Sequence, residues 1–428
     1  MSIMKAMYSG VSGLSAESQA LGVIGDNVAN TNTIGFKQSR ALFEDILGGV
    51  SQRGGVGGGV RMVRAQQIFA QGTLLNTGQA TDLALSGDGF FVVSGTIGGI
   101  SGDFYTRAGQ TTLDANGTLV NAQGLSVQGY PVAADGTVGS TPGPITVSTA
   151  ALPPKPSNLL EITANLDSTS MPAAMAWDPL NPGASSNFST SMTVYDSLGT
   201  AHAVDVYFTT SGGGAWEYHA LASGDEVVGG TPGEATEIAT GTLSFTSDGA
   251  LQDAQPTAGG TVDWNGATAA QALTFDFGTP IAAGGSGLDG TTQFATASAI
   301  SAQTQDGYAS GALSGIKVSA TGLVEGVYTN GQTISVAQLA IAKFASNDGL
   351  ARFGYNLWSA TPESGEAVLG AAGSGGRGAV VSGALEQSNV DIAAQFVDMI
   401  GHQRAFQANS KTITTADEML QEIVNLKR

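Results

Sequence analysis

Several common features are missing from this sequence. The chain contains no cysteine, so disulfide bonds and thiol chemistry are excluded. Only 12% of its 428 residues are charged, about half the usual ~25%. No apolar run approaches the ~18 residues of a membrane span, which argues against membrane insertion. Residues 1–20 lack the apolar core and the small-residue cleavage site of a secretory signal peptide.

Basic residues are missing from the middle of the chain. No Lys or Arg occurs between Lys155 and Lys317, whereas residues 156–316 carry sixteen Asp and Glu. Most of the net charge of −19 therefore lies in this segment. This argues against binding to nucleic acid, because nothing in the segment can neutralise phosphates. A solvated, outward-facing surface is the simplest interpretation of such charge.

Motifs of catalysis are missing as well. The three histidines, His202, His219 and His402, fall in two expected strands and one expected terminal helix, without zinc-ligand spacing. No G-x-S-x-G elbow is present, and the glycine-rich run at 54–59 lacks the Lys and Ser/Thr of a phosphate loop. We interpret that run as a flexible connector. The sequence predicts no enzyme, no cofactor and no metal site.

Both ends of the chain carry an apolar repeat of seven residues. The repeats form two apolar stripes: Met7, Leu14, Leu21 and Val28 near the start of the chain, and Ile392, Met399, Phe406, Ile413 and Leu420 near its end. The apolar Phe396 lies beside the second stripe. Sustained heptads are typical of coiled-coil-like helices with one apolar face. An amphipathic helix docked on a domain core gives the same pattern. Because both ends show it, we favour pairing of the two ends.

Between these helices the sequence is of β type. Alternating apolar residues are punctuated by Asp-Gly and Asn-Gly turns, which is typical of sandwiches or barrels. We expect an α+β multidomain fold, with paired terminal helices and discontinuous, nested, mainly-β domains. The expected ranges are 1–70 with 385–428 for the helical domain and its connector, 71–157 with 312–384 for a discontinuous β domain, and 158–311 for an inserted acidic β domain.

One segment after the first helix, residues 26–36, has more small polar residues than a single turn needs. Asn30 and Asn32 can end a helix in the left-handed conformation, and Gly35 permits a further bend. Phe36 is then an anchor separate from the stripe. We interpret the cluster, which also includes Asn27, as polar groups that bond to neighbouring copies of the chain.

The same segment carries a family resemblance. At 27–37 the chain reads NVANTNTIGFK, which resembles the signature of the axial proteins of the bacterial flagellum, the rod and hook subunits. Further segments resemble that family's first β domain and its C-terminal helix. ITANLDS, TVYDSLGT, NLWSATPESG and the long central insertion resemble the hook subunits in particular. Phe406 departs from the Tyr of many relatives, which puts one inter-helix hydrogen bond in doubt.

The resemblance implies a structural subunit that polymerises into a curved, flexible tube and passes torque from motor rod to filament as a universal joint. It implies contacts with further copies, with a rod protein at one end, and with a hook cap and a hook–filament junction protein at the other. Export would use the flagellar type III apparatus, without a cleaved signal peptide. The terminal helices would line the inner tube, and the acidic domain would lie outermost.

Two alternatives stay open. A distal rod protein of the same family would share both ends of the chain but would normally lack so large an insertion. A secreted β-rich binding protein, from a different class, would share the glycine-rich strands but would not need paired terminal heptads.

Overall fold

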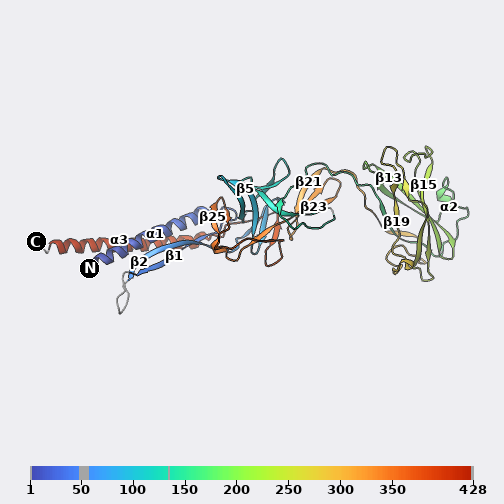
Figure 1. Ribbon diagram of the computed structural model, residues 1–428. Coiled ribbons are helices and arrows are strands. Elements are labelled where there is room, and N and C mark those ends of the chain that lie inside the picture. Colours follow the sequence, from blue (N-terminus) through green and yellow to red (C-terminus); the bar gives the residue numbers. More distant parts are fainter. Residues whose placement is uncertain (1, 48–56, 134, 426–428) are drawn as a thin grey trace. The chain divides into compact units, whose positions relative to one another are not determined.

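The computed structural model of the chain describes residues 2–47, 57–133 and 135–425 (Figure 1). The fold is mostly β, with one long helix near each end of the chain. The expected combination of terminal helices and β domains is thereby confirmed.

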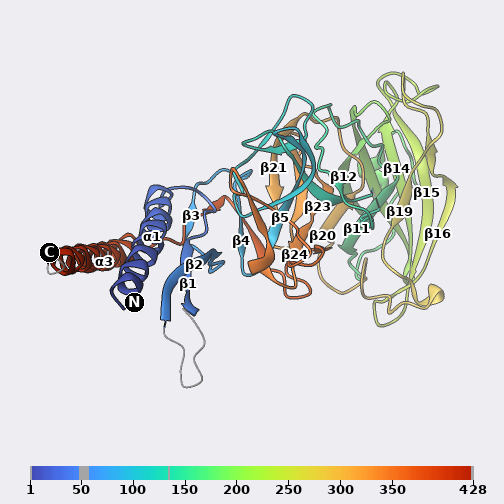
Figure 2. The same ribbon diagram turned by 60° about the vertical axis from the view of Figure 1, so that its left-hand side comes forward.

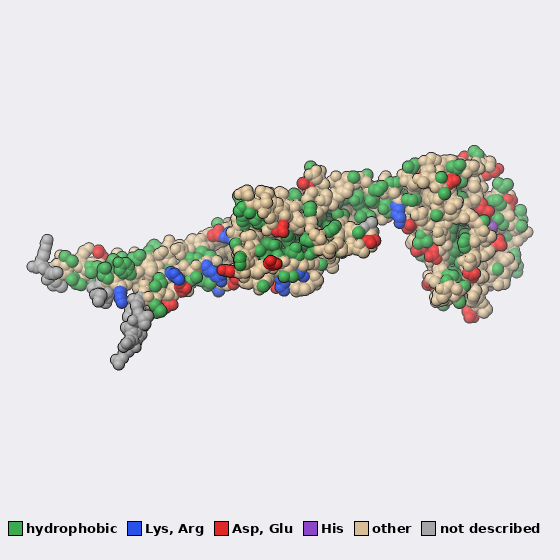
Figure 3. Space-filling model, viewed as in Figure 1, with side chains coloured by type: hydrophobic (Ala, Val, Ile, Leu, Met, Phe, Trp, Pro, Cys, Tyr) green, Lys and Arg blue, Asp and Glu red, His purple; other side chains and the backbone are tan. Residues whose placement is uncertain are grey.

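The chain divides into two compact units. Unit 1 combines Met1–Thr149, Gly315–Val327 and Thr333–Arg428, and unit 2 consists of Ala150–Ser314 and Tyr328–Gln332. Acidic side chains are scattered over unit 2, whereas exposed apolar side chains gather on the helices of unit 1 (Figure 3).

Unit 1 begins with helix α1 (Ser2–Ala29) and ends with helix α3 (Ile392–Asn425), and the two helices lie against each other (Figure 1). Strands β1 (Ser39–Leu47) and β2 (Gly57–Gln67) form an antiparallel ribbon beside α1 (Figure 2).

The ribbon corrects one expectation. Gly57 pairs with Leu47, and residues 57–59 begin β2. The prediction of a flexible connector at 54–59 is therefore wrong for 57–59, and 54–56 lie outside the described residues. The physical reason is that alternating β-forming residues follow directly, and the strand they form extends back into the glycines.

The remainder of unit 1 is built around a sheet of thirteen strands. Its main path is β21 (Leu313–Val318), β22 (Leu323–Tyr328), β23 (Thr333–Leu339), β9 (Ser126–Pro131), β5 (Phe90–Ile97), β6 (Ile100–Thr106), β26 (Leu357–Ser359) and β25 (Ala351–Gly354). The strands off this path are β7 (Thr111–Leu113), β8 (Leu119–Asn121), β10 (Gly143–Pro144), β24 (Ile341–Lys343) and β27 (Val368–Gly370). One of its cores is aromatic and includes Phe90, Phe344 and Trp358.

Two short strand pairs join a C-terminal segment of the chain to an N-terminal one. Strand β28 (Ala379–Ser382) pairs with β4 (Leu83–Ser86), and β29 (Ala384–Glu386) pairs with β3 (Leu74–Asn76). These pairs place the residues that precede α3 beside those that follow the β1–β2 ribbon.

Unit 2 contains two principal sheets that share one hydrophobic core. The larger is a meander of β12 (Phe188–Tyr195), β13 (Ala201–Gly212), β14 (Ala215–Ser223), β15 (Ala235–Phe245) and β16 (Leu251–Gly259). The smaller joins β19 (Thr274–Asp276), β11 (Leu159–Asn165) and β20 (Ala299–Gln305). Minor elements are α2 (Pro182–Ser185), β17 (Thr261–Val262) and β18 (Gln271–Ala272). Buried and exposed positions alternate along β13, as expected for strands with one face on a core.

Candidate assembly surface and junction

The terminal helices meet through the smallest side chains of α1. Gly10, Gly13 and Ala16 are buried. A Cβ atom added at Gly13 would lie 2.6 Å from Nδ2 of Asn409, and one added at Gly10 would lie 3.0 Å from Cγ1 of Ile413. The absence of side chains at these glycines therefore lets α3 approach the backbone of α1 closely.

The residues of the two predicted stripes lie along the contact between α1 and α3, which we call the helix seam, and beyond it. The half-buried members are Met7, Leu14, Leu21, Val28, Met399, Phe406, Ile413 and Leu420. On α3, Ile392 and Phe396 are exposed, and so are Val397 and Ile400. A strip of apolar side chains on α3 therefore faces away from the rest of its own chain.

The polar cluster at the end of α1 makes its hydrogen bonds within the chain. The buried amide of Asn27 accepts from the N–H of Ser39 at 2.8 Å and donates to the Ser39 carbonyl at 2.7 Å and to Oε1 of Gln395 at 2.9 Å. Asn30 donates to Oδ1 of Asp26 at 3.0 Å, and Thr31 donates to the carbonyl of Val28 at 2.8 Å.

The side chains of Asn27, Asn30, Thr31 and Thr33 find partners in the same chain, and their contacts with neighbouring copies stay a prediction. The prediction of a left-handed helix end is wrong, because neither Asn30 nor Asn32 adopts a positive φ angle. The last turn of α1 instead tightens through hydrogen bonds from the Asn30 N–H to the carbonyls of Asp26 and Asn27. Asn32 is exposed.

Gly35 and Phe36 anchor the chain where it leaves the helix. Gly35 has φ +71°, and a Cβ there would lie 2.5 Å from the backbone N of Ala108. The predicted bend is confirmed, and this close approach requires glycine. Phe36 is only 2% exposed, so it is an anchor inside its own chain. The guanidinium carbon of Arg352 lies 5.2 Å from the centre of its ring.

A buried ionic cluster follows directly, which no pattern in the sequence indicated. Nζ of Lys37 lies 2.6 Å from Oε1 of Glu386, and Nη1 of Arg107 lies 3.3 Å from Oε2 of the same carboxylate. Lys37 also donates to the carbonyl of Ala70 at 2.8 Å, and Gly72 donates its N–H to Glu386 at 2.9 Å. The side chains of Lys37 and Glu386 are fully buried.

Burial disfavours the charged forms of the two basic side chains in this cluster. Desolvation lowers the pKa of Lys37, although the carboxylate of Glu386 counteracts it. Burial likewise lowers the pKa of Arg107, again against the attraction of Glu386. One carboxylate faces two cations and accepts a backbone hydrogen bond, and these contacts offset part of the desolvation cost of the charges. It connects the segment after α1, the β domain and the segment before α3.

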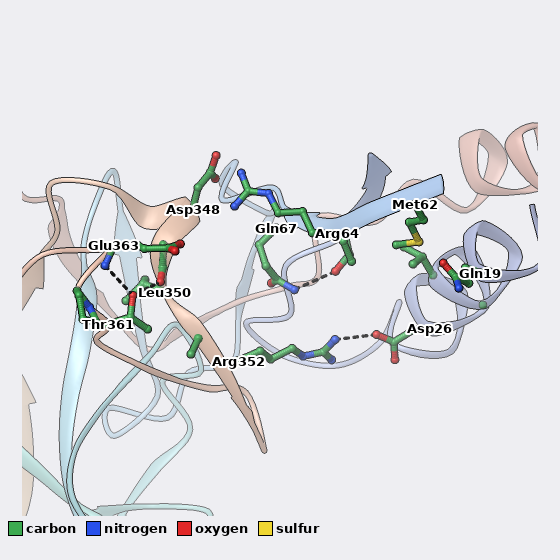
Figure 4. Close-up of a pocket in the computed structure, with 17 residues that line it drawn as sticks. Gln19, Asp26, Met62, Arg64, Gln67, Asp348, Leu350, Arg352, Thr361 and Glu363 are labelled. Atoms are coloured by element: carbon green, nitrogen blue, oxygen red, sulfur yellow. Dashed lines mark hydrogen bonds and ion pairs between the residues drawn. The ribbon is translucent and has the colours of Figure 1, made fainter. Parts of the chain in front are cut away.

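A cleft lies beside this junction in unit 1, between α1, strand β2 and the turns around β25 (Figure 4). It encloses about 990 Å³. Its lining includes Val23, Met62 and Leu350. Asp26 and Arg352 form an ion pair of 2.8 Å at its side.

Neither a membrane-spanning helix nor a cluster of metal ligands occurs among the described residues. No helix in the ranges that the structure describes is both long and apolar enough to span a membrane. Over the same ranges, no group of three or more His, Asp or Glu is arranged to hold a metal ion.

Comparison with known protein families gives four matches. Residues 7–37 match the flagella basal body rod protein family, and 381–426 match the C-terminal domain of the flagellar basal body rod FlgEFG proteins. Residues 84–167 match the D1 domain of the flagellar hook protein FlgE/F/G, and 165–308 match the D2 domain of the flagellar basal body protein FlaE. With paired ends and β domains between them, these matches define an axial protein of the bacterial flagellum.

Whole-chain relatives identify the family within this class. The flagellar hook protein FlgE of Salmonella typhimurium is 39% identical over 97% of this chain and 98% of its own length. FlgE of Escherichia coli is 39% identical over 99% of this chain and 100% of its own length. The chain belongs to the FlgE family of flagellar hook proteins.

A solved structure shares the fold. The crystal structure of the Helicobacter pylori flagellar hook protein FlgE2 aligns with a TM-score of 0.51 and 17% identity. The alignment covers 72% of this chain and 98% of that one.

Proposed function

We propose that this chain is the structural subunit of a flagellar hook, a curved tube that acts as a universal joint between motor rod and filament. The full-length likeness to proteins named flagellar hook protein supports this assignment. Its physical basis is the apolar strip on α3, where Phe396 is 50%, Val397 is 70% and Ile400 is 52% exposed. Exposed apolar side chains do not stabilise a soluble monomer, whereas a polymer buries them between its subunits.

In the proposed assembly, the domain of residues 1–70 with 385–428 forms the inner tube, and α1 and α3 are its coiled-coil-like helices. Residues 71–157 with 312–384 form the middle layer, and 158–311 lie outermost, where the excess of acidic residues keeps the surface solvated. The predicted stripe residues, including Met7, Leu14, Met399 and Phe406, would then be covered by neighbouring copies as well as by the partner helix.

The proposal assigns partners and a location by the same reasoning. The chain contacts copies of itself, a rod protein at the proximal end, and a hook cap and a junction protein at the distal end. It reaches the cell exterior through the flagellar type III export apparatus. Its role is mechanical, so we propose neither an enzymatic activity nor a cofactor.

A paired substitution tests the assembly surface. Phe396→Asp together with Ile400→Asp places two charges on the exposed strip without touching the core of the monomer. We expect secretion of the protein but no hooks on the cells, as seen by electron microscopy. Met171→Asp is the matched control, since Met171 is an 82% exposed apolar residue of unit 2. Normal hooks from the double variant would contradict the proposal, and straight polymers from the unmodified chain would favour a distal rod protein.

A further inference from the structure

Arg352 contacts two residues of the junction. Its Nη1 lies 2.8 Å from Oδ2 of Asp26, and its guanidinium lies over the ring of the buried Phe36. Asn30 donates to the other oxygen of Asp26 at 3.0 Å, which orients the carboxylate toward Arg352. The polar cluster at the end of α1 therefore positions an ion pair between that helix and the β domain.

This ion pair lies at the side of the cleft in Figure 4 and joins opposite walls. Asp26 belongs to the wall formed by α1, and Arg352 belongs to β25 in the other wall. A second bridge crosses nearby, from Nε2 of Gln66 to Oδ2 of Asp348 at 2.8 Å.

The wall on the β domain is held by its own hydrogen bonds. Thr361 donates its hydroxyl to the carbonyl of Gly349 at 2.6 Å, and the fully buried Ser364 donates to the carbonyl of Thr361 at 2.9 Å. A Cβ at Gly349 would lie 2.4 Å from the backbone N of Ser364. These contacts hold the wall together, and we therefore expect the width of the cleft to change by movement of the helices.

The bonds across the junction are of two kinds. Lys37, Glu386 and Arg107 form a buried cluster whose separation is costly, because it would leave charges without partners. The side chains of Asp26 and Arg352 are 43% and 42% exposed, so water and salt can replace their contact at little cost. The buried cluster is therefore suited to be a hinge, and the weak ion pair across the open cleft beside it is suited to be a latch.

We propose that the pair of Asp26 and Arg352 is a salt-sensitive latch across this cleft. Its release lets the helix pair turn about the buried cluster of Lys37, Glu386 and Arg107, and the fraction of released subunits sets the curvature of the polymer. The last step rests on the proposed function, whereas the latch itself is a property of the single chain. Because exposed ion pairs are weak, removing this one shifts the open-to-closed ratio by about 2- to 5-fold.

Distance measurements on the full chain test the latch directly. The chain has no cysteine, so Gln19→Cys with Glu363→Cys places two spin labels on opposite walls without background labelling. We expect the longer-distance population to grow about 2- to 5-fold when salt rises from about 0.01 M to about 1 M. Asp26→Asn should give the same growth at low salt and remove the salt response.

Two controls separate the latch from general loosening. Labels at Asp103→Cys and Glu363→Cys both lie on the β domain and should show no change with salt. Glu44→Gln removes another exposed ion pair of unit 1, with Arg61, and should leave the cleft distances unchanged. Unchanged distances in the Asp26→Asn variant would overturn the latch.

Electron microscopy of hooks from the Asp26→Asn strain tests the consequence. We expect assembled hooks with altered curvature. Hooks of normal curvature, together with an opened cleft in the labelled protein, would overturn the link to bending and leave the hook assignment intact. If the unmodified chain forms no hooks at all, the proposed function and the link to bending fail together. The labelled protein still decides whether the latch exists.

Discussion

Lys37 and Glu386 are 349 positions apart in the chain, yet their charged groups meet at 2.6 Å with both side chains fully buried. Arg107 shares the same carboxylate from the β domain. Three segments distant in sequence therefore meet at one carboxylate, which fixes the start of α3 and the end of the linker after α1. This contact explains how two chain ends separated by the whole of both β domains are held in one place.

Loss of the Glu386 charge should destabilise unit 1 strongly. Glu386→Gln leaves two cations buried without a counterion, which we expect to cost about 3–5 kcal/mol. Glu44→Gln removes a carboxylate from an exposed ion pair and should cost about 0–1 kcal/mol. Hydrogen exchange of peptides from unit 1, followed by mass spectrometry, measures both variants. Equal effects of the two substitutions would show that burial of the cluster is unimportant.

The two asparagines of the cluster should behave differently. Asn27→Ala removes three hydrogen bonds in a buried position and should cost about 1–3 kcal/mol. Asn32→Ala changes an exposed side chain and should alter stability by no more than ~0.5 kcal/mol. Urea denaturation of the two purified variants checks this. A larger loss for Asn32 would mean that the assignment of partners within the chain is mistaken.

The glycines of α1 provide a test of the helix seam. Gly13→Leu should separate α1 from α3, because even a Cβ there would lie within 3.0 Å of all three terminal side-chain atoms of Asn409. Gly22→Leu is the matched control, since no atom lies within 4 Å of a Cβ at that position. We expect loss of helical circular dichroism at a lower temperature for Gly13→Leu. The control should gain up to ~1 kcal/mol in helix propensity. Equal melting of both variants would argue against close packing.

Unit 2 should lose stability in acid through Asp306. Burial alone would raise the pKa of Asp306, but hydrogen bonds from the N–H groups of Leu159 and Asn158 and from Lys155 outweigh burial and lower it from 3.8. A carboxyl with a lowered folded-state pKa stabilises the fold above its unfolded pKa, and this contribution is lost as the pH falls through the lowered value. Asp306→Asn should therefore reduce stability at neutral pH and weaken its dependence on pH below about 4.

Tryptophan fluorescence can follow this transition. Trp358→Phe removes the tryptophan of unit 1, so the emission that remains comes from the three tryptophans of unit 2. If the stability of Asp306→Asn falls with acid as that of the unmodified chain does, Asp306 is not a source of the acid sensitivity.

The sequence was sufficient to predict the terminal helices and the β character between them. Both are local patterns: the seven-residue repeats that include Leu14 and Phe406, and the alternation along β13. Such patterns can be recognised without knowing which residues the segments contact. The helix seam was not predictable in the same way. Gly10 and Gly13 contribute by having no side chain, so a search for apolar repeats passes over them.

The junction was hidden for another reason. A lone charged residue such as Glu386 is normally on the surface, and nothing in its neighbourhood identifies Lys37 and Arg107 as its partners. The unusual polarity of residues 26–36 is visible in the sequence. Its partners within the chain could not be predicted, because sequence alone does not show that Asn27 reaches Gln395 or that Asn30 reaches Asp26.

Electron microscopy of basal bodies with labelled subunits tests the central claim most directly. A small tag inserted after Gly284, an exposed residue of unit 2, carries the label. We expect label along the outside of a curved segment between rod and filament. Label confined to a straight rod, or no label on any flagellum, would contradict it.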